Sequence, residues 1–232
     1  MADLVAASAF SWWQDAGVDT FVAEAPHDWL SEPPTPAAVS GAIPADQRLP
    51  DRLAEFQAWL LASDAVPLAA TGAPRVGPSG DPGSGLMVLV DMPSPEDVAA
   101  GRLLSGAPGE LFERMMAAID RDRDTLYLAS LAPARIAAGR LDDAGAAALA
   151  RIARHHVGLA RPRALLLFGD ACAKALLGGP VARMRGGWRE LDTAAGPVRT
   201  IATLRPEKLL GQPNLKKHAW EDLQRLKEGL EP

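Results

Sequence analysis

Four short, mostly apolar runs in the last two-thirds of the chain limit the folds that this sequence can adopt. They occupy residues 86–91, 126–129, 164–168 and 198–203. Runs of this length that are apolar without alternation are typical of strands buried on both faces, as in a parallel sheet. The sequence therefore predicts four strands in the core of one domain.

Segments with apolar residues at helical spacing separate these runs. Helices are predicted at residues 108–119, 142–159, 171–177 and 215–230. The alternation predicts an α/β fold, a three-layer α/β/α sandwich around a central, mainly parallel four-stranded sheet. Ligands of such folds bind beyond the carboxyl ends of the strands. The candidate positions at those ends are Asp91, Ser130, Gly169 and Leu204, with the residues that follow each.

The N-terminal part of the chain does not have this pattern. Five prolines between residues 31 and 50 indicate an extended linker, so residues 1–49 are predicted to be an N-terminal extension and residues 50–232 the domain. Residues 51–61 have helical spacing, with Asp51 as the expected N-cap. A stretch rich in Gly, Pro and Ser at 71–85 is predicted to be flexible.

Composition narrows the class of protein. No apolar run is long enough to span a bilayer, and the first ten residues lack the basic start of a signal peptide, so a soluble cytoplasmic protein is expected. The net charge is −5, but residues 161–232 hold 13 Lys and Arg against 8 Asp and Glu, a net +5 that suits an anionic ligand. The sequence has no Gly-rich dinucleotide-binding loop after the first strand and no Walker-type phosphate-binding motif.

Six segments from residue 86 onward match, in order, the motifs of one known family. The resemblance is to the family 4 (iron–sulfur) type of the uracil-DNA glycosylase superfamily, and it covers about two-thirds of the chain. It implies a flipped-out base in a pocket, an attacking water and a stabilised leaving base. The segments are 90–97 (VDMPSPED), 101–106 (GRLLSG), 127–130 (YLAS), 161–169 (RPRALLLFG), 185–188 (RGGW) and 203–223 (TLRPEKLLGQPNLKKHAWEDL).

The resemblance implies roles for four positions, each of which departs from the family pattern. Asp91 occupies the position of the family's Glu, which positions the attacking water. Alternatively, Asp91 caps the turn after the strand. Leu104 replaces the Phe that stacks on the base, and Ser130 replaces the Asn that reads its polar edge. Arg205 replaces the His at the leaving oxygen, where a guanidinium could also stabilise the anion or grip a phosphate.

The same alignment of motifs adds a pocket turn and a DNA-contacting set. Pro93 and Ser94 belong to the turn of the substrate pocket, with Ser94 where the family has Gly. The predicted DNA contacts are Pro206, Lys208, Lys216 and Arg185.

The iron–sulfur cluster of the resembled family is expected to be absent, and no cofactor is predicted. The only cysteine is Cys172, which reads as a buried apolar residue at the start of a helix, and the four histidines show no metal-ligand spacing. Residues 56–59 (FQAW) fall roughly where the family places N-terminal cysteine ligands. Packing is therefore expected to replace whatever the cluster does there.

Three functional hypotheses follow. The first is a divergent glycosylase that removes uracil or another damaged base from single-stranded or uracil-containing DNA. The second is a catalytically inactive DNA-binding protein that uses Arg205, Lys208, Lys216 and Lys217. The third is a structural or interaction protein whose acidic N-terminal extension, with Trp12, Trp13 and Trp29, binds a protein partner. No membrane partner is expected.

Overall fold

The fold is taken from a computed structural model that describes residues 48–67, 72–135 and 143–230. All of these belong to one compact unit, Ala38–Pro232. The predicted extension, including Trp12, lies outside the described residues apart from residues 48–49. Within the described part, no helix is long and apolar enough to cross a membrane.

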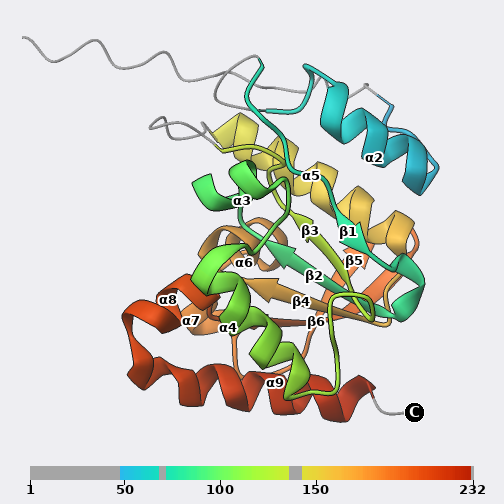
Figure 1. The fold of residues 1–232 in the computed structure, drawn as a ribbon. Helices are drawn as coiled ribbons and strands as arrows, with labels where there is room; N and C mark the ends of the chain where they lie inside the picture. Colours follow the sequence, from blue (N-terminus) through green and yellow to red (C-terminus); the bar gives the residue numbers. More distant parts are fainter. Residues whose placement is uncertain (1–47, 68–71, 136–142, 231–232) are drawn as a thin grey trace, which may run out of the picture. The chain divides into compact units, whose positions relative to one another are not determined.

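A six-stranded sheet in the order β1-β3-β2-β4-β6-β5 forms the centre of the unit (Figure 1). The middle of the sheet is the predicted set of four parallel strands, and every residue of β2, β3 and β4 is buried. The predicted α/β fold is thereby confirmed. The parallel strands are β2 (Leu86–Val90), β3 (Tyr127–Ser130), β4 (Ala164–Phe168) and β6 (Gly196–Thr203).

Two antiparallel edge strands, β1 (Ser79–Gly80) and β5 (Arg189–Thr193), were not predicted. The residues of β1 are both exposed, and β5 reads RELDT with one buried residue, Leu191. Edge strands with charged side chains are common because they discourage pairing with other chains, and they carry no apolar run. The stretch predicted to be flexible at 71–85 contains β1 and a short helix, so that prediction was wrong for part of the stretch.

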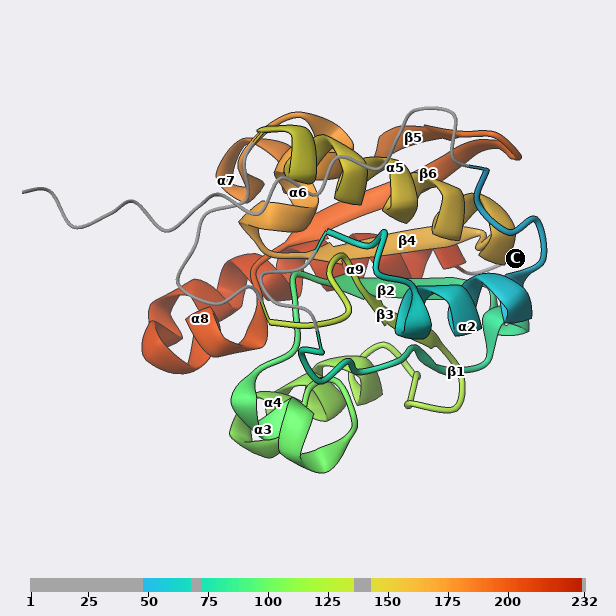
Figure 2. The ribbon, with the colours of Figure 1, turned by 90° about the horizontal axis from the view of Figure 1, so that it is seen from above.

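Helices cover both faces of the sheet. On one face α5 packs against α6 and α2, and on the other α9 packs against β4 and β6 beside α4 (Figures 1 and 2). The predicted helices are confirmed within two residues at each end as α2, α4, α5, α6 and α9. The helices are α2 (Leu53–Ala62), α3 (Pro95–Ala100), α4 (Gly106–Ala117), α5 (Asp143–Ala160), α6 (Asp170–Leu177), α7 (Val181–Met184), α8 (Pro206–Gly211) and α9 (Lys216–Leu230), with 3-10 turns η1 (Pro82–Ser84) and η2 (Pro213–Leu215).

The expected N-cap at Asp51 was wrong. The cap position of α2 is Arg52, which makes no side-chain capping bond. Asp51 lies one residue before this cap position, and its carboxylate accepts a hydrogen bond from Arg48 at 2.6 Å.

Helix α2 docks on the sheet through a buried aromatic residue and a chain of hydrogen bonds. Phe56 is fully buried, with its ring 4.9 Å from that of His156. Gln57 donates to the Tyr127 hydroxyl at 2.7 Å, and that hydroxyl lies 2.7 Å from Nε2 of His156. Burial lowers the pKa of His156 to about 3, so its ring is neutral. These side chains join α2, β3 and α5 in one satisfied polar network inside the core.

Candidate functional site

Asp91 follows the carboxyl end of β2 and reaches across to the start of α6. Its Oδ1 accepts a hydrogen bond from the backbone N–H of Cys172 at 3.0 Å. Gly169, the N-cap residue of α6, has no side chain to offer, and it has a φ of +94°. A Cβ at that position would lie 2.7 Å from Oδ2 of Asp91. The glycine is therefore needed for the carboxylate to reach the helix end, and Asp91 supplies the cap that α6 lacks.

The electrostatic environment of Asp91 is mixed. Its side chain is 12% exposed, and Nη1 of Arg205 lies 3.6 Å from its Oδ2. Burial raises the pKa of Asp91, while the hydrogen bond from Cys172 and the charge of Arg205 oppose the rise, and Asp170 adds to it. A carboxylate with a raised pKa is a stronger base than a solvated aspartate, and this one retains some solvent access.

The turn after Asp91 is built by a capping box. The Asp97 amide donates to Oγ of Ser94 and the Ser94 amide donates to Oδ2 of Asp97, both at 3.0 Å. The other oxygen of Asp97 accepts from the amide of Ser105 at 2.6 Å. Arg135, from the segment after β3, donates to the Pro93 carbonyl at 3.3 Å. Asp97 is thus a buried structural acid, and Ser94 takes a glycine position of the resembled family with an ordinary φ of −77°.

Ser130 lies next to this turn because of the strand register. It pairs with Val90, the residue before Asp91, at the end of the β2–β3 ladder. Its side chain is buried, with 6% of the residue exposed. The structure thus places Ser130 and Asp91 at the same edge of the sheet, as predicted for parallel strands.

Leu104 has an unusual backbone conformation just before α4. Its φ is +53°, which is uncommon for a residue other than glycine, and its side chain is buried. The Arg123 guanidinium holds the Leu104 carbonyl at 2.5 Å and the Leu103 carbonyl at 3.1 Å. A Cβ on Gly109 would collide with the same Leu104 carbonyl. The backbone conformation of Leu104 is therefore maintained by close packing against Gly109 of α4 and by the hydrogen bonds from Arg123.

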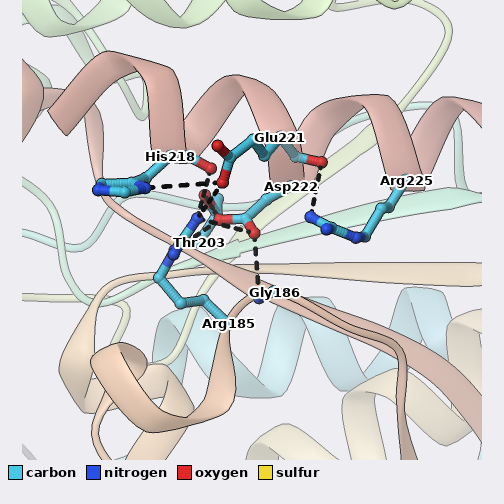
Figure 3. Close-up of polar contacts among 7 residues, drawn as sticks. All are labelled: Arg185, Gly186, Thr203, His218, Glu221, Asp222 and Arg225. Atoms are coloured by element: carbon cyan, nitrogen blue, oxygen red, sulfur yellow. Dashed lines mark hydrogen bonds and ion pairs between the residues drawn. The ribbon is translucent and has the colours of Figure 1, made fainter.

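A second carboxylate cluster lies at the end of β6 (Figure 3). Asp222 of α9 is fully buried and accepts hydrogen bonds from Arg185 at 3.1 and 3.2 Å and from the Gly186 amide at 3.0 Å. The Thr203 hydroxyl donates to it at 2.8 Å, two residues before Arg205. Burial raises the pKa of Asp222, although all of these partners oppose the rise. The cluster ties α9 and the segment before β5 to the strand end that carries Arg205.

The predicted DNA contacts are divided between the surface and this cluster. Lys208 and Lys216 are exposed, and Pro206 is buried as the first residue of α8, for which Arg205 is the N-cap. Arg185 is 18% exposed and occupied by Asp222 and the His218 carbonyl. The motifs that contain Arg185 and Asp222 were recognised in the sequence, but their pairing across 37 residues was not.

The described residues contain no group of three or more His, Cys, Asp and Glu side chains that could hold a metal ion. The chain's single cysteine, Cys172, is fully buried, as predicted, and burial raises its pKa well above the ordinary value. A cluster ligated by several cysteines does not fit these residues.

The comparisons with known proteins agree with this architecture. No curated protein sequence matches the chain. The model of the uracil DNA glycosylase superfamily matches residues 78–224, which is well over half of the chain and includes β2 to β6 and most of α9. The chain therefore belongs to the uracil-DNA glycosylase superfamily.

Proposed function

We propose that this protein is a divergent glycosylase of the superfamily that hydrolyses the N-glycosidic bond of uracil or another damaged base in DNA. The observation that carries the proposal is the placement of Asp91, a partly accessible carboxylate with a raised pKa, 3.6 Å from the Arg205 guanidinium. A base and a cation side by side at the carboxyl edge of the sheet are the two groups that this hydrolysis needs.

The reaction joins a water oxygen to C1′ of the sugar and breaks the bond from C1′ to the base nitrogen. Ionised Asp91 accepts a proton from the water, and the electron pair of the broken bond leaves on the base. Arg205 stabilises the resulting anion, for which its permanent charge is suited. A general base of this kind contributes about 10²- to 10⁴-fold to the rate.

The pocket residues predict weak selection of the base. Ser130 has one hydroxyl in place of the paired donor and acceptor of an amide, so uracil and cytosine are discriminated less well. Leu104 is buried and has no aromatic face to stack on a base, while Pro93 and Ser94 shape the turn after Asp91. We therefore expect a slow enzyme with a broad choice of bases.

The DNA partner contacts Arg205, Lys208 and Lys216, and single-stranded DNA is the simplest substrate because its bases need no unpairing. Arg185, which we also predicted to touch DNA, is better placed to orient the end of β6 through Asp222. No iron–sulfur cluster takes part, since one cysteine cannot ligate it, and the network of Gln57, Tyr127 and His156 docks α2.

A catalytically inactive DNA-binding protein is the second candidate, and one observation favours it. Asp91 caps α6 through the Cys172 amide, which is a sufficient structural reason for a carboxylate at this position. A structural cap and a catalytic base respond differently to substitution of Asp91, so one variant can distinguish the two candidate functions.

The test is single-turnover cleavage of a labelled single-stranded oligonucleotide that carries one uracil, followed by alkali. Asp91→Asn keeps an oxygen for the Cys172 amide but not a base, so we expect folded protein with activity reduced about 10²- to 10⁴-fold. Asp192→Asn, an exposed carboxylate on β5, is the matched control and should retain full activity. No scission by the wild type, with salt-sensitive retention of the oligonucleotide, would establish the binding protein instead.

A further inference from the structure

An open apolar groove of about 280 Å³ lies between α4 and α9. Leu111 and Met115 of α4 form one wall, and Trp220 of α9 forms the opposite one. Arg114 and Lys216 also line it, and no acidic side chain does. The groove thus combines an apolar interior with two cations.

Trp220 is 42% exposed, although the neighbouring leucine and methionine side chains are buried. Lys216 and Lys217 precede it by four and three residues, so the three side chains share one face of α9. The acids that follow Trp220 are directed elsewhere: Asp222 is buried against Arg185, and Glu221 lies 3.6 Å from both Arg185 and His218. Two lysines therefore precede the exposed indole on its face of α9, and Arg114 lines the same groove.

Helix α8 links the groove to the Asp91–Arg205 site, because its N-cap is Arg205 and its Leu209 lines the groove. Leu209 contributes to the groove, and it lies four residues after Arg205, a rise of about 6 Å along the helix. Figure 1 places α8 and the start of α9 at the edge of the sheet to which the arrowheads of β2 and β4 point.

We propose that this groove binds a nucleobase of single-stranded DNA that neighbours the base held at Asp91, with Trp220 stacking on it and Lys216 and Arg114 contacting phosphates. The inference rests on the proposed function in that it assumes a DNA substrate. An aromatic face flanked by cations is the arrangement by which proteins bind single strands without sequence preference. Such a platform also compensates for the missing aromatic residue at Leu104, because it supplies stacking next to the reacting base.

Fluorescence anisotropy with two labelled probes tests the proposal, a thymidine oligonucleotide and an abasic strand of the same length. Wild-type protein should prefer the thymidine strand because only that strand offers bases to stack. Trp220→Ala should weaken thymidine binding about 5- to 150-fold and leave abasic binding nearly unchanged. Trp220→Phe should recover most of the affinity, which a loss of fold would not allow.

Lys216→Ala is a second variant that does not touch the apolar packing. It should reduce the salt dependence of binding by about 0.7 in slope, the value for one phosphate contact in single strands. Lys174→Ala, which removes an exposed lysine of α6 outside this groove, is the matched control and should leave the slope unchanged.

The outcomes separate this inference from the proposed function. Uracil excision with equal thymidine binding by wild type and Trp220→Ala would overturn the groove and keep the glycosylase. Loss of the preference for thymidine in Trp220→Ala, without excision by any variant, would support the groove in a binding protein. Equal binding of both probes by the wild type would also overturn the inference.

Discussion

Asp91 and Asp222 are two aspartates with raised pKa values in very different surroundings. Asp222 is fully buried, and both of its oxygens are engaged by a guanidinium, an amide and a hydroxyl. Asp91 is 12% exposed, receives one backbone amide and lies 3.6 Å from a guanidinium that is itself 52% exposed. The first carboxylate is saturated with partners, whereas the second has lone pairs left for water or substrate.

The contrast shows that a shifted pKa does not by itself identify a catalytic group. Burial raises the pKa of both carboxyls, and only the number of partners and the access to solvent distinguish them. On this basis Asp222 stabilises the end of β6, and Asp91 is the carboxylate that we propose as the base. Four measurements test the distinction, beginning with the largest expected effect.

Asp222→Ala should lower the free energy of unfolding by about 3–5 kcal/mol, because it leaves the mostly buried Arg185 with only the 3.6 Å ion pair to the exposed Glu221. Urea unfolding measures this loss. Glu221→Ala, the exposed neighbour that also faces Arg185, is the matched control and should cost no more than about 1 kcal/mol. A loss at Asp222 as small as that of the control would contradict its assignment as a structural acid.

Tyr127→Phe should lower the free energy of unfolding by about 1–3 kcal/mol, because Gln57 and buried His156 each lose a hydrogen-bond partner. This network is the neutral counterpart of the Asp222 cluster, because breaking it leaves no unpaired charge. Urea unfolding and the uracil assay should show reduced stability with unchanged excision. A loss as large as that of Asp222→Ala would mean that charge is not what makes the Asp222 cluster costly to break.

Asp91→Asn should change the pH dependence of stability in a definite direction. Because the folded-state pKa of Asp91 lies above its ordinary value of 3.8, its contribution is fully present below that value and is lost as the pH rises through the raised pKa. The asparagine retains the acceptor for the Cys172 amide and lacks this decline. Urea unfolding between acid and neutral pH should therefore show the wild type losing stability relative to the variant. A wild type that gains on the variant as the pH rises would contradict the direction of the shift.

Arg205→Ala should have the smallest effect on stability, below about 1 kcal/mol, because its ion pair is long and half exposed. Removal of the cation should raise the pKa of Asp91 further. The acid limb of the pH–rate profile for excision should therefore move to higher pH. Thermal unfolding and a pH–rate profile measure the two effects, with Arg205→Lys as the variant that restores the charge. An unchanged acid limb would show that Arg205 does not act on Asp91.

Local sequence was sufficient to predict most of the fold. The runs at β2 and β4 are apolar throughout because strands buried on both faces require it, and α5 and α9 carry apolar residues at helical spacing. The edge strand β5 could not be recognised in this way, since four of its five residues are not buried. The predicted cap at Asp51 was wrong because the helix begins one residue later than expected, with Arg52 at the cap position.

Local hydrophobic patterns in the sequence were enough to predict the parallel α/β core and the candidate site positions after its strands. These patterns report which segments are buried and in what order they follow one another. Only the tertiary structure showed which partners each of the two acids meets. Asp91 meets the Cys172 amide 81 residues away, and Asp222 meets Arg185 37 residues away. Partners, burial and solvent access at such separations depend on how helices pack on the sheet, which no local pattern encodes.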